Sequence, residues 1–217
     1  MELIKDFTFN LDKQHVLEVL ETYLPSSGED RSKIYDTLIN ELYDNIDPIG
    51  FFKLIDKPKE YDFESFKECS KIAPCLITLG SRITDKIDNL FNENKFVDAV
   101  MLDVMASTLL FEYNSQMYEH IFNYFYNLGF GITCRVAPGD GEIPIEYQSD
   151  IIDRLEAAKP YGIYTIKGYA VHPPKSLTYV HGVDEKLEKI KRRHSCRECT
   201  NISCSIRAIK EKAKGIF

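Results

Sequence analysis

The sequence lacks the features that mark several common classes of protein. It has no stretch of about 18 uncharged apolar residues, the length that a membrane-spanning helix needs, and its first residues, MELIKD, show no signal-peptide pattern. It also has no P-loop, no G-x-S-x-G, no H-E-x-x-H and no strand-to-helix G-x-G-x-x-G segment. The chemistries that depend on those motifs are therefore not indicated, and we expect a cytoplasmic protein with no membrane partner.

Length and charge narrow the choice further. The 217 residues suffice for one well-packed domain with or without a small appendage, and 44% hydrophobic and 28% charged residues are ordinary for a globular protein. Residues 185–214 hold ten Lys and Arg against four Asp and Glu, a charge of +6, which leaves −13 for the rest of a chain whose net charge is −7. An acidic body with a basic tail argues against nucleic acid as a partner.

The hydrophobic pattern predicts both helices and strands. Apolar residues at helical spacing predict helices over residues 14–24, 30–46, 82–91 and 145–158, and a longer helix or helix pair over 94–128. Clustered β-branched and aromatic residues predict strands over residues 50–55, 69–80, 130–136, 161–167 and 176–182. The charged stretch 56–67 is expected to be a surface loop, and residues 184–193 a short charged helix.

One loop, residues 134–144 with the sequence CRVAPGDGEIP, combines an arginine, two glycines and two prolines. Proline restricts the backbone, and glycine lets a ligand approach the peptide groups closely. The loop is therefore able to hold a small anionic or zwitterionic ligand through Arg135. Its composition is equally compatible with an ordinary Pro/Gly turn in which Arg135 is solvated.

A family resemblance bears on that choice. The spacing Arg135-x-Ala137-Pro138-Gly139-x4-Pro144, followed about thirty residues later by the segment PPKSLT from residue 173, resembles the C-terminal reactivation domain of cobalamin-dependent methionine synthase. That family carries an R-x-x-P-G-Y-x-x-x-P loop and a later P-x-x-S-V-S strand. The resemblance implies an α+β fold, a twisted antiparallel sheet braced by long helices. It covers a core of residues 69–183, which leaves 1–68 as an N-terminal helical segment of the same domain and 184–217 as a basic, cysteine-containing tail.

The resemblance also implies a ligand and the residues that hold it. Domains of this family bind S-adenosylmethionine, so Arg135 is expected to pair with the carboxylate of the methionine moiety. Backbone groups of Ala137 and Gly139 are expected to meet the adenine and ribose, and Glu112 to face the ammonium or the sulfonium. Helical spacing places Asp103 and Ser107 on one face and Glu112 on another, and without the family alignment Glu112 is an exposed helix residue.

The implied partners follow from the same family. Its domain presents a methyl group to cobalamin that has slipped to the inactive cob(II) state, while a separate donor supplies one electron. This chain has no D-x-H-x-x-G segment of the kind that binds cobalamin, so the corrinoid is expected on another polypeptide, a methyltransferase subunit. The chain departs from the family pattern at Asp140, Glu142 and Ile143. It also contains no Trp, and therefore no W-x-P-F-F stretch.

Cysteine and histidine residues supply the remaining candidates. The six cysteines are expected to be reduced. Cys196, Cys199 and Cys204 lie in a polar tail and are able to hold zinc or an iron–sulfur cluster, or to remain free or redox-active thiols. His172 and His181 are interpreted as hydrogen-bonded structural residues.

Three functions stay open at this point. The chain is a stand-alone reactivation partner that binds S-adenosylmethionine, an interaction module that uses its cysteine tail, or a free-standing methyltransferase. Whether it is itself an enzyme is left undecided by the sequence.

Overall fold

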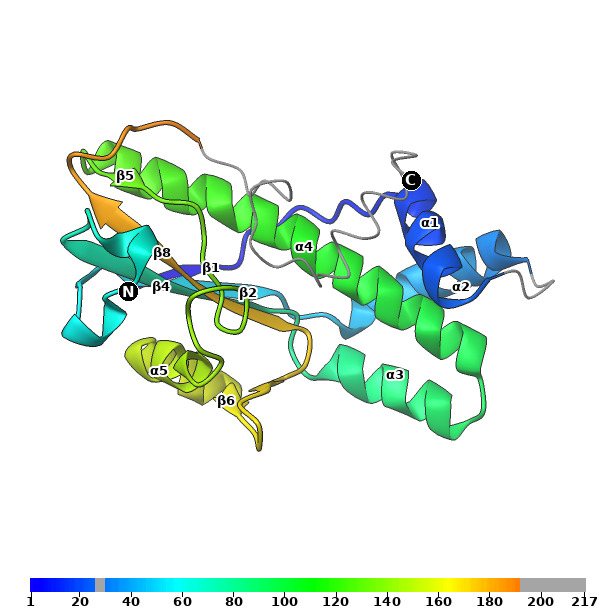
Figure 1. The fold of residues 1–217 in the computed structure, drawn as a ribbon. Coiled ribbons are helices and arrows are strands. Elements are labelled where there is room, and N and C mark those ends of the chain that lie inside the picture. Colours follow the sequence, from blue (N-terminus) through cyan, green and yellow to red (C-terminus); the bar gives the residue numbers. More distant parts are fainter. Residues whose placement is uncertain (26–29, 192–217) are drawn as a thin grey trace.

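The computed structural model describes residues 1–25 and 30–191 and has the expected α+β architecture (Figure 1). Its helices are α1 (Lys13–Tyr23), α2 (Arg31–Asn45), α3 (Arg82–Asn92), α4 (Phe96–Asn127) and α5 (Tyr147–Arg154). Its strands are β1 (Glu2–Ile4), β2 (Ile49–Phe52), β3 (Ile55–Asp56), β4 (Lys71–Thr78), β5 (Gly131–Ile132), β6 (Tyr164–Thr165), β7 (Val171–His172) and β8 (Ser176–Asp184). Three short 3-10 turns, η1 (Lys59–Tyr61), η2 (Glu64–Phe66) and η3 (Glu156–Tyr161), complete the described chain.

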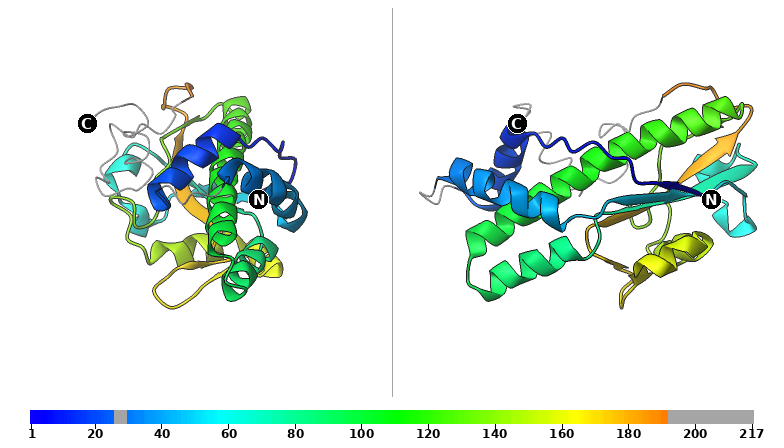
Figure 2. Two further views of the ribbon diagram at one scale, coloured as in Figure 1. Left: turned by 90° about the vertical axis from the view of Figure 1, so that its right-hand side faces the viewer. Right: turned by 180° about the vertical axis from the view of Figure 1, so that it is seen from behind.

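The longest helix, α4, organises the molecule. It is one uninterrupted helix of 32 residues, which settles the choice between a helix and a helix pair, and it is followed by Gly129 at a φ of +85°. Figures 1 and 2 show α1, α2 and α3 gathered around its first half and the sheet against its second half. The helix therefore joins a helical end of the molecule to a sheet end.

The main sheet is antiparallel and has the strand order β1-β2-β4-β8-β5, with β3 also pairing with β4. The pair β4–β8 is the longest and runs from Lys71 opposite Val183 to Thr78 opposite Ser176. Side chains alternate between the two faces of the sheet. The face that carries Tyr179 packs in the core with α4, and the face that carries Val180 packs in a second core with α5 (Figure 1).

Two predicted strands are shorter than expected. Residues 130–136 were predicted as one strand, but only Gly131–Ile132 and an isolated bridge at Val136 pair with β8. Between them a side chain replaces a backbone acceptor, because the Thr133 hydroxyl accepts the Gly182 N–H at 2.9 Å. Residues 161–167 were likewise predicted as a strand, but only Tyr164–Thr165 is extended, and it forms a separate two-stranded sheet with β7.

Three further predictions about local structure were wrong. The helix predicted over 145–158 ends at Arg154 and continues as the turn η3. The stretch 56–67 is not only surface loop, since η1 and η2 bury Tyr61 and Phe66 completely. The described part of the charged segment predicted as a helix from residue 184 is not helical, because Asp184 ends β8 and its carboxylate accepts the Lys186 N–H at 3.0 Å. Strand β1 was not predicted at all.

The buried tyrosine of η1 provides a test of this packing. The Tyr61 hydroxyl donates a 2.5 Å hydrogen bond to Asp150 of α5. Tyr61→Phe should lower the free energy of unfolding by about 2 kcal/mol in a urea titration, because a bond to a charged acceptor is lost inside the protein. Tyr147→Phe is the matched control, since that hydroxyl donates to the exposed Glu60 carbonyl and should cost less. Equal stability of the Tyr61 variant and the wild type would contradict the expectation.

Candidate functional site

Arg135 lies half-buried at the sheet edge next to β8. The isolated bridge between Val136 and Val180 fixes the strand alternation there, so that Val136 faces the α5 side, and Arg135 and Ala137 face the α4 side. The guanidinium carbon of Arg135 is 5.8 Å from the ring centroid of Tyr179. Within residues 1–25 and 30–191 no carboxylate forms an ion pair with it. A partly buried guanidinium that stacks on a ring and has no carboxylate is suited to bind an anion.

The loop that follows Arg135 is held by its own backbone. Gly139 donates to the Ile143 carbonyl at 2.8 Å, and Asp140 donates to the Ala137 carbonyl at 3.0 Å. Gly139 has a φ of +79°, and a Cβ on it would lie 2.8 Å from the Ile145 side chain, so glycine is required for two reasons. Neither the Ala137 N–H nor the Gly139 carbonyl takes part in these two bonds.

The acidic residues of the loop do not all face Arg135. The Glu142 carboxylate accepts the Ser65 N–H at 3.1 Å and so ties the loop to η2, on the α5 side of the sheet. Glu142, one of the departures from the family pattern, thus directs its charge to the Ser65 N–H. Its role is therefore to hold the loop.

Glu112 lies on a flank of α4 away from β8. Its carboxylate accepts a 3.2 Å hydrogen bond from Gln116, which in turn exchanges two bonds with the backbone of Thr8. Glu112 therefore faces the N-terminal segment, on a different side of the helix from Ser107, as helical spacing predicts.

The other polar face of α4 is attached to β8. Lys175, at the entrance to β8, lies 2.7 Å from Asp103 and donates a 2.8 Å hydrogen bond to Ser107. Six residues further along the strand and eleven further along the helix, the rings of His181 and Tyr118 are 5.9 Å apart. Asp103 and Ser107 thus share a face as predicted, and this face contacts the strand that also carries Tyr179.

His181 is buried and neutral. Its Nδ1 is 2.8 Å from the Thr133 carbonyl oxygen, which makes Nδ1 the protonated nitrogen, and the prediction that it is a hydrogen-bonded residue is confirmed. The pKa of His181 is lowered to about 4, chiefly by burial and to a smaller extent by the nearby charge of Arg135, against the opposing effect of the Thr133 bond. Burial also raises the pKa of Tyr179. Tyr179 and His181 are therefore both uncharged at neutral pH.

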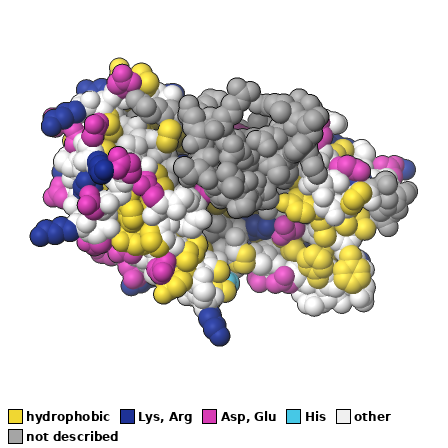
Figure 3. All heavy atoms as spheres, viewed as in Figure 1, with side chains coloured by type: hydrophobic (Ala, Val, Ile, Leu, Met, Phe, Trp, Pro, Cys, Tyr) yellow, Lys and Arg dark blue, Asp and Glu magenta, His cyan; other side chains and the backbone are white. Residues whose placement is uncertain are grey.

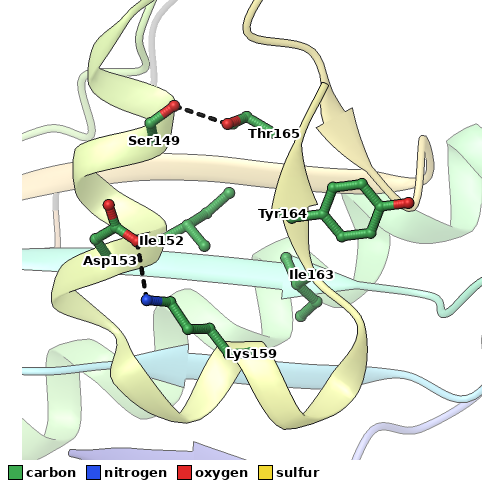
Figure 4. Close-up of a pocket in the computed structure, with 7 residues that line it drawn as sticks. All are labelled: Ser149, Ile152, Asp153, Lys159, Ile163, Tyr164 and Thr165. Carbon is green, nitrogen blue, oxygen red and sulfur yellow. Dashed lines mark hydrogen bonds and ion pairs between the residues drawn. The ribbon is translucent and has the colours of Figure 1, made fainter. Parts of the chain in front are cut away.

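A hollow of about 300 Å³ lies elsewhere, between α5 and β6 (Figure 4). It contains an ion pair between Lys159 and Asp153 at 3.4 Å and a 2.7 Å hydrogen bond between Ser149 and Thr165. None of the predicted site residues lines it. Its polar groups satisfy one another, so we assign it no ligand.

The metal and membrane predictions concern other parts of the chain. Cys196, Cys199 and Cys204 lie outside the described residues, so zinc or cluster binding by the tail stays a prediction. In the described part of the chain, no group of three or more His, Cys, Asp or Glu side chains is arranged to hold a metal ion. The helices described there include none that is both long and apolar enough to cross a membrane.

An antiparallel sheet crossed by one long helix, with an arginine loop beside its longest strand, makes an α+β fold consistent with that of the methionine synthase reactivation domain. The chain is similar to the MetH reactivation domain, whose crystal structure was solved bound to AdoHcy. The TM-score is 0.53 at 13% identity, over 86% of this chain and 71% of that chain. No protein-family model and no curated protein matches the chain. The similarity confirms the predicted fold.

Three residues of this region were not singled out as site residues from the sequence. They are Tyr179, over which the Arg135 guanidinium lies, Lys175, which contacts Asp103 and Ser107 of α4, and Asn114 of α4 itself. The alternation of β8 predicts the inward direction of Tyr179 once the strand is known. Asn114 carries a weaker signal, because it is one of several polar residues in α4.

Proposed function

We propose that this protein binds S-adenosylmethionine at Arg135 and supports reductive remethylation of cobalamin on a corrinoid-dependent methyltransferase. The observation that carries the proposal is the half-buried Arg135, stacked on Tyr179 with no carboxylate partner among the described residues, in a fold shared with a domain solved with AdoHcy. A guanidinium in that setting suits the carboxylate of a methionine moiety. The Ala137 N–H and Gly139 carbonyl would meet the adenine and ribose.

The remethylation part of the proposal is consistent with the residues present. A reduced corrinoid is itself a strong nucleophile, so the protein needs to position the methyl donor rather than supply a general base. Tyr179 and His181, the buried titratable residues described near Arg135, are both uncharged at neutral pH. The corrinoid subunit and a one-electron donor would be separate polypeptides.

Calorimetric titration with S-adenosylmethionine tests the proposal. Arg135→Ala should weaken binding at least tenfold, because the loss of a desolvated charge pair costs about 2 to 5 kcal/mol. The affinity of Arg135→Lys should fall between those of the wild type and Arg135→Ala, since lysine keeps the charge and loses the bidentate hydrogen bonding of the guanidinium. Lys159→Ala, in the hollow near α5, should bind as the wild type does.

The other outcomes separate the remaining functions. A wild type that does not bind at millimolar ligand would contradict the proposal and favour an interaction module. Exposed Phe91 and Phe96 at the tip between α3 and α4, an end where Figure 3 shows hydrophobic side chains at the surface, would then be the place to look for a partner. Methyl transfer to another nucleophile without any corrinoid protein would instead indicate a free-standing methyltransferase.

A further inference from the structure

Asn114 of α4 is a buried polar side chain that the fold does not satisfy. It is 8% exposed, and its Oδ1 is buried without a hydrogen-bond partner in the described structure. Most buried carbonyl oxygens are paired, since an unpaired one has lost its water without replacement. An orphaned acceptor of this kind is expected where a ligand supplies the missing donor.

The contacts of α4 with β8 give the position of Asn114 relative to Arg135. Asn114 shares a helix face with Ser107 and Tyr118, seven residues before it and four after it. Those two residues contact β8 at Lys175 and His181. The eleven residues from Ser107 to Tyr118 advance about 16 Å, and the six from Lys175 to His181 about 20 Å, so helix and strand run side by side in the same direction.

We call the line along which residues 107–118 of α4 meet residues 175–181 of β8 the seam. Interpolation along the seam shows which residue of β8 lies opposite Asn114. It lies about two thirds of the way from Ser107 to Tyr118, which corresponds to Tyr179 on β8. Tyr179 is the residue over which the Arg135 guanidinium lies. Glu112, two residues from Asn114, is turned by about 200° around the helix axis and faces Gln116 and the N-terminal segment instead.

The seam therefore offers one cation and two acceptors. His181 donates from Nδ1 to the Thr133 carbonyl, which leaves its buried Nε2 as an acceptor, also without a partner in the part of the chain described. An α-amino acid group carries a carboxylate for a guanidinium and, one carbon away, an ammonium with three N–H donors. The carboxylate matches the guanidinium of Arg135, and the ammonium matches the unpaired acceptors, Asn114 Oδ1 and His181 Nε2.

We infer that Asn114 accepts a hydrogen bond from the α-ammonium group of a bound amino-acid moiety whose carboxylate lies on Arg135. The inference rests on the proposed function and names the residue that recognises the ammonium, a role the sequence resemblance gave to Glu112. The ligand class is an S-adenosyl amino acid with a free α-amino group. Ligands without the amino-acid end gain nothing from Asn114.

The test compares Asn114→Leu, Asn114→Asp and Glu112→Gln by calorimetric titration with S-adenosylmethionine and with 5′-methylthioadenosine, which lacks the amino-acid end. Asn114→Leu should weaken S-adenosylmethionine binding about tenfold and leave methylthioadenosine binding unchanged, because one charge-assisted hydrogen bond is lost. Asn114→Asp should keep or strengthen the binding. Glu112→Gln, on the opposite flank of the same helix, should bind as the wild type does.

Thermal melting of the ligand-free variants separates recognition from a structural role. Asn114→Leu should melt at or above the wild-type temperature, because an unpaired buried acceptor is removed. A variant that melts well below the wild type and also loses binding would overturn the assignment. Unchanged S-adenosylmethionine binding by Asn114→Leu, alongside its loss in Arg135→Ala, would overturn this inference and leave the proposed function standing. No binding by the wild type would overturn both.

Discussion

Lowering the pH from 7.5 to 4 should remove roughly 3 kcal/mol of stability through His181 alone. The buried imidazole has its pKa lowered from 6.5 to about 4, so in this window the unfolded chain binds a proton that the folded chain does not. Stability that rests on a depressed histidine pKa is complete above pH 6.5 and is lost as the pH falls toward 4. Urea titrations at intervals of half a pH unit give the slope of the free energy of unfolding against pH.

His181→Gln isolates this contribution. Glutamine is able to keep the bond to the Thr133 carbonyl and does not titrate, so the variant should lose much less stability over the same pH range. Carboxylates such as Asp184, whose pKa is lowered chiefly by the Lys186 N–H and then by Ser70, also lose stabilising contacts in acid. They do so equally in both proteins, so the difference between the two curves is the measurement. Parallel curves would show that His181 is not buried as described.

Phe125→Ala should destabilise the protein by about 3 to 5 kcal/mol, the usual cost of removing a buried aromatic ring and leaving a cavity. Phe125 is fully buried in the second half of α4, and its ring centroid is 5.9 Å from that of Phe52 on β2. The loss would therefore fall on the contact between the long helix and the sheet. Chemical denaturation monitored by far-ultraviolet circular dichroism measures it.

Tyr126→Ala is the matched control, because Tyr126 is the next residue of the same helix and is 53% exposed. Its loss should change the free energy of unfolding by less than about 1 kcal/mol, since surface substitutions seldom cost more. A similar loss in both variants would contradict the expectation that the burial of Phe125 is what stabilises this end of α4.

The elements that the sequence predicted well are those with a long, regular pattern. The helix α4 and the strands β4 and β8 carry enough apolar residues at one period to be found without tertiary information. The strand around Thr133 was overestimated because its side-chain hydroxyl replaces a ladder bond, which no local pattern reveals. The buried position of Tyr61 depends on Asp150, 89 residues away.

The surroundings of the candidate site residues followed from the sequence only in part, for similar reasons. A fixed spacing pointed to Arg135 and its loop, and the structure shows that this arginine is half-buried over Tyr179. The direction of Glu142 and the flank of α4 on which Glu112 lies depend on contacts with Ser65 and with Gln116 and Thr8. The position of Asn114 opposite Tyr179 depends on the register of α4 against β8, which the sequence does not give.

The middle position of β8 has a consequence for synthesis of the chain. Lys71 pairs with Val183 and Thr78 with Ser176, so these partners are 112 and 98 residues apart in sequence. While the chain is being made, β1, β2, β4 and α4 exist before β8 does, and β4 presents an unpaired edge that invites aggregation. A nascent chain that has not reached residue 176 contains Arg135 but neither Tyr179 nor His181. The side chains that surround Arg135 on the α4 face of the sheet are therefore completed in one step, when β8 enters the sheet.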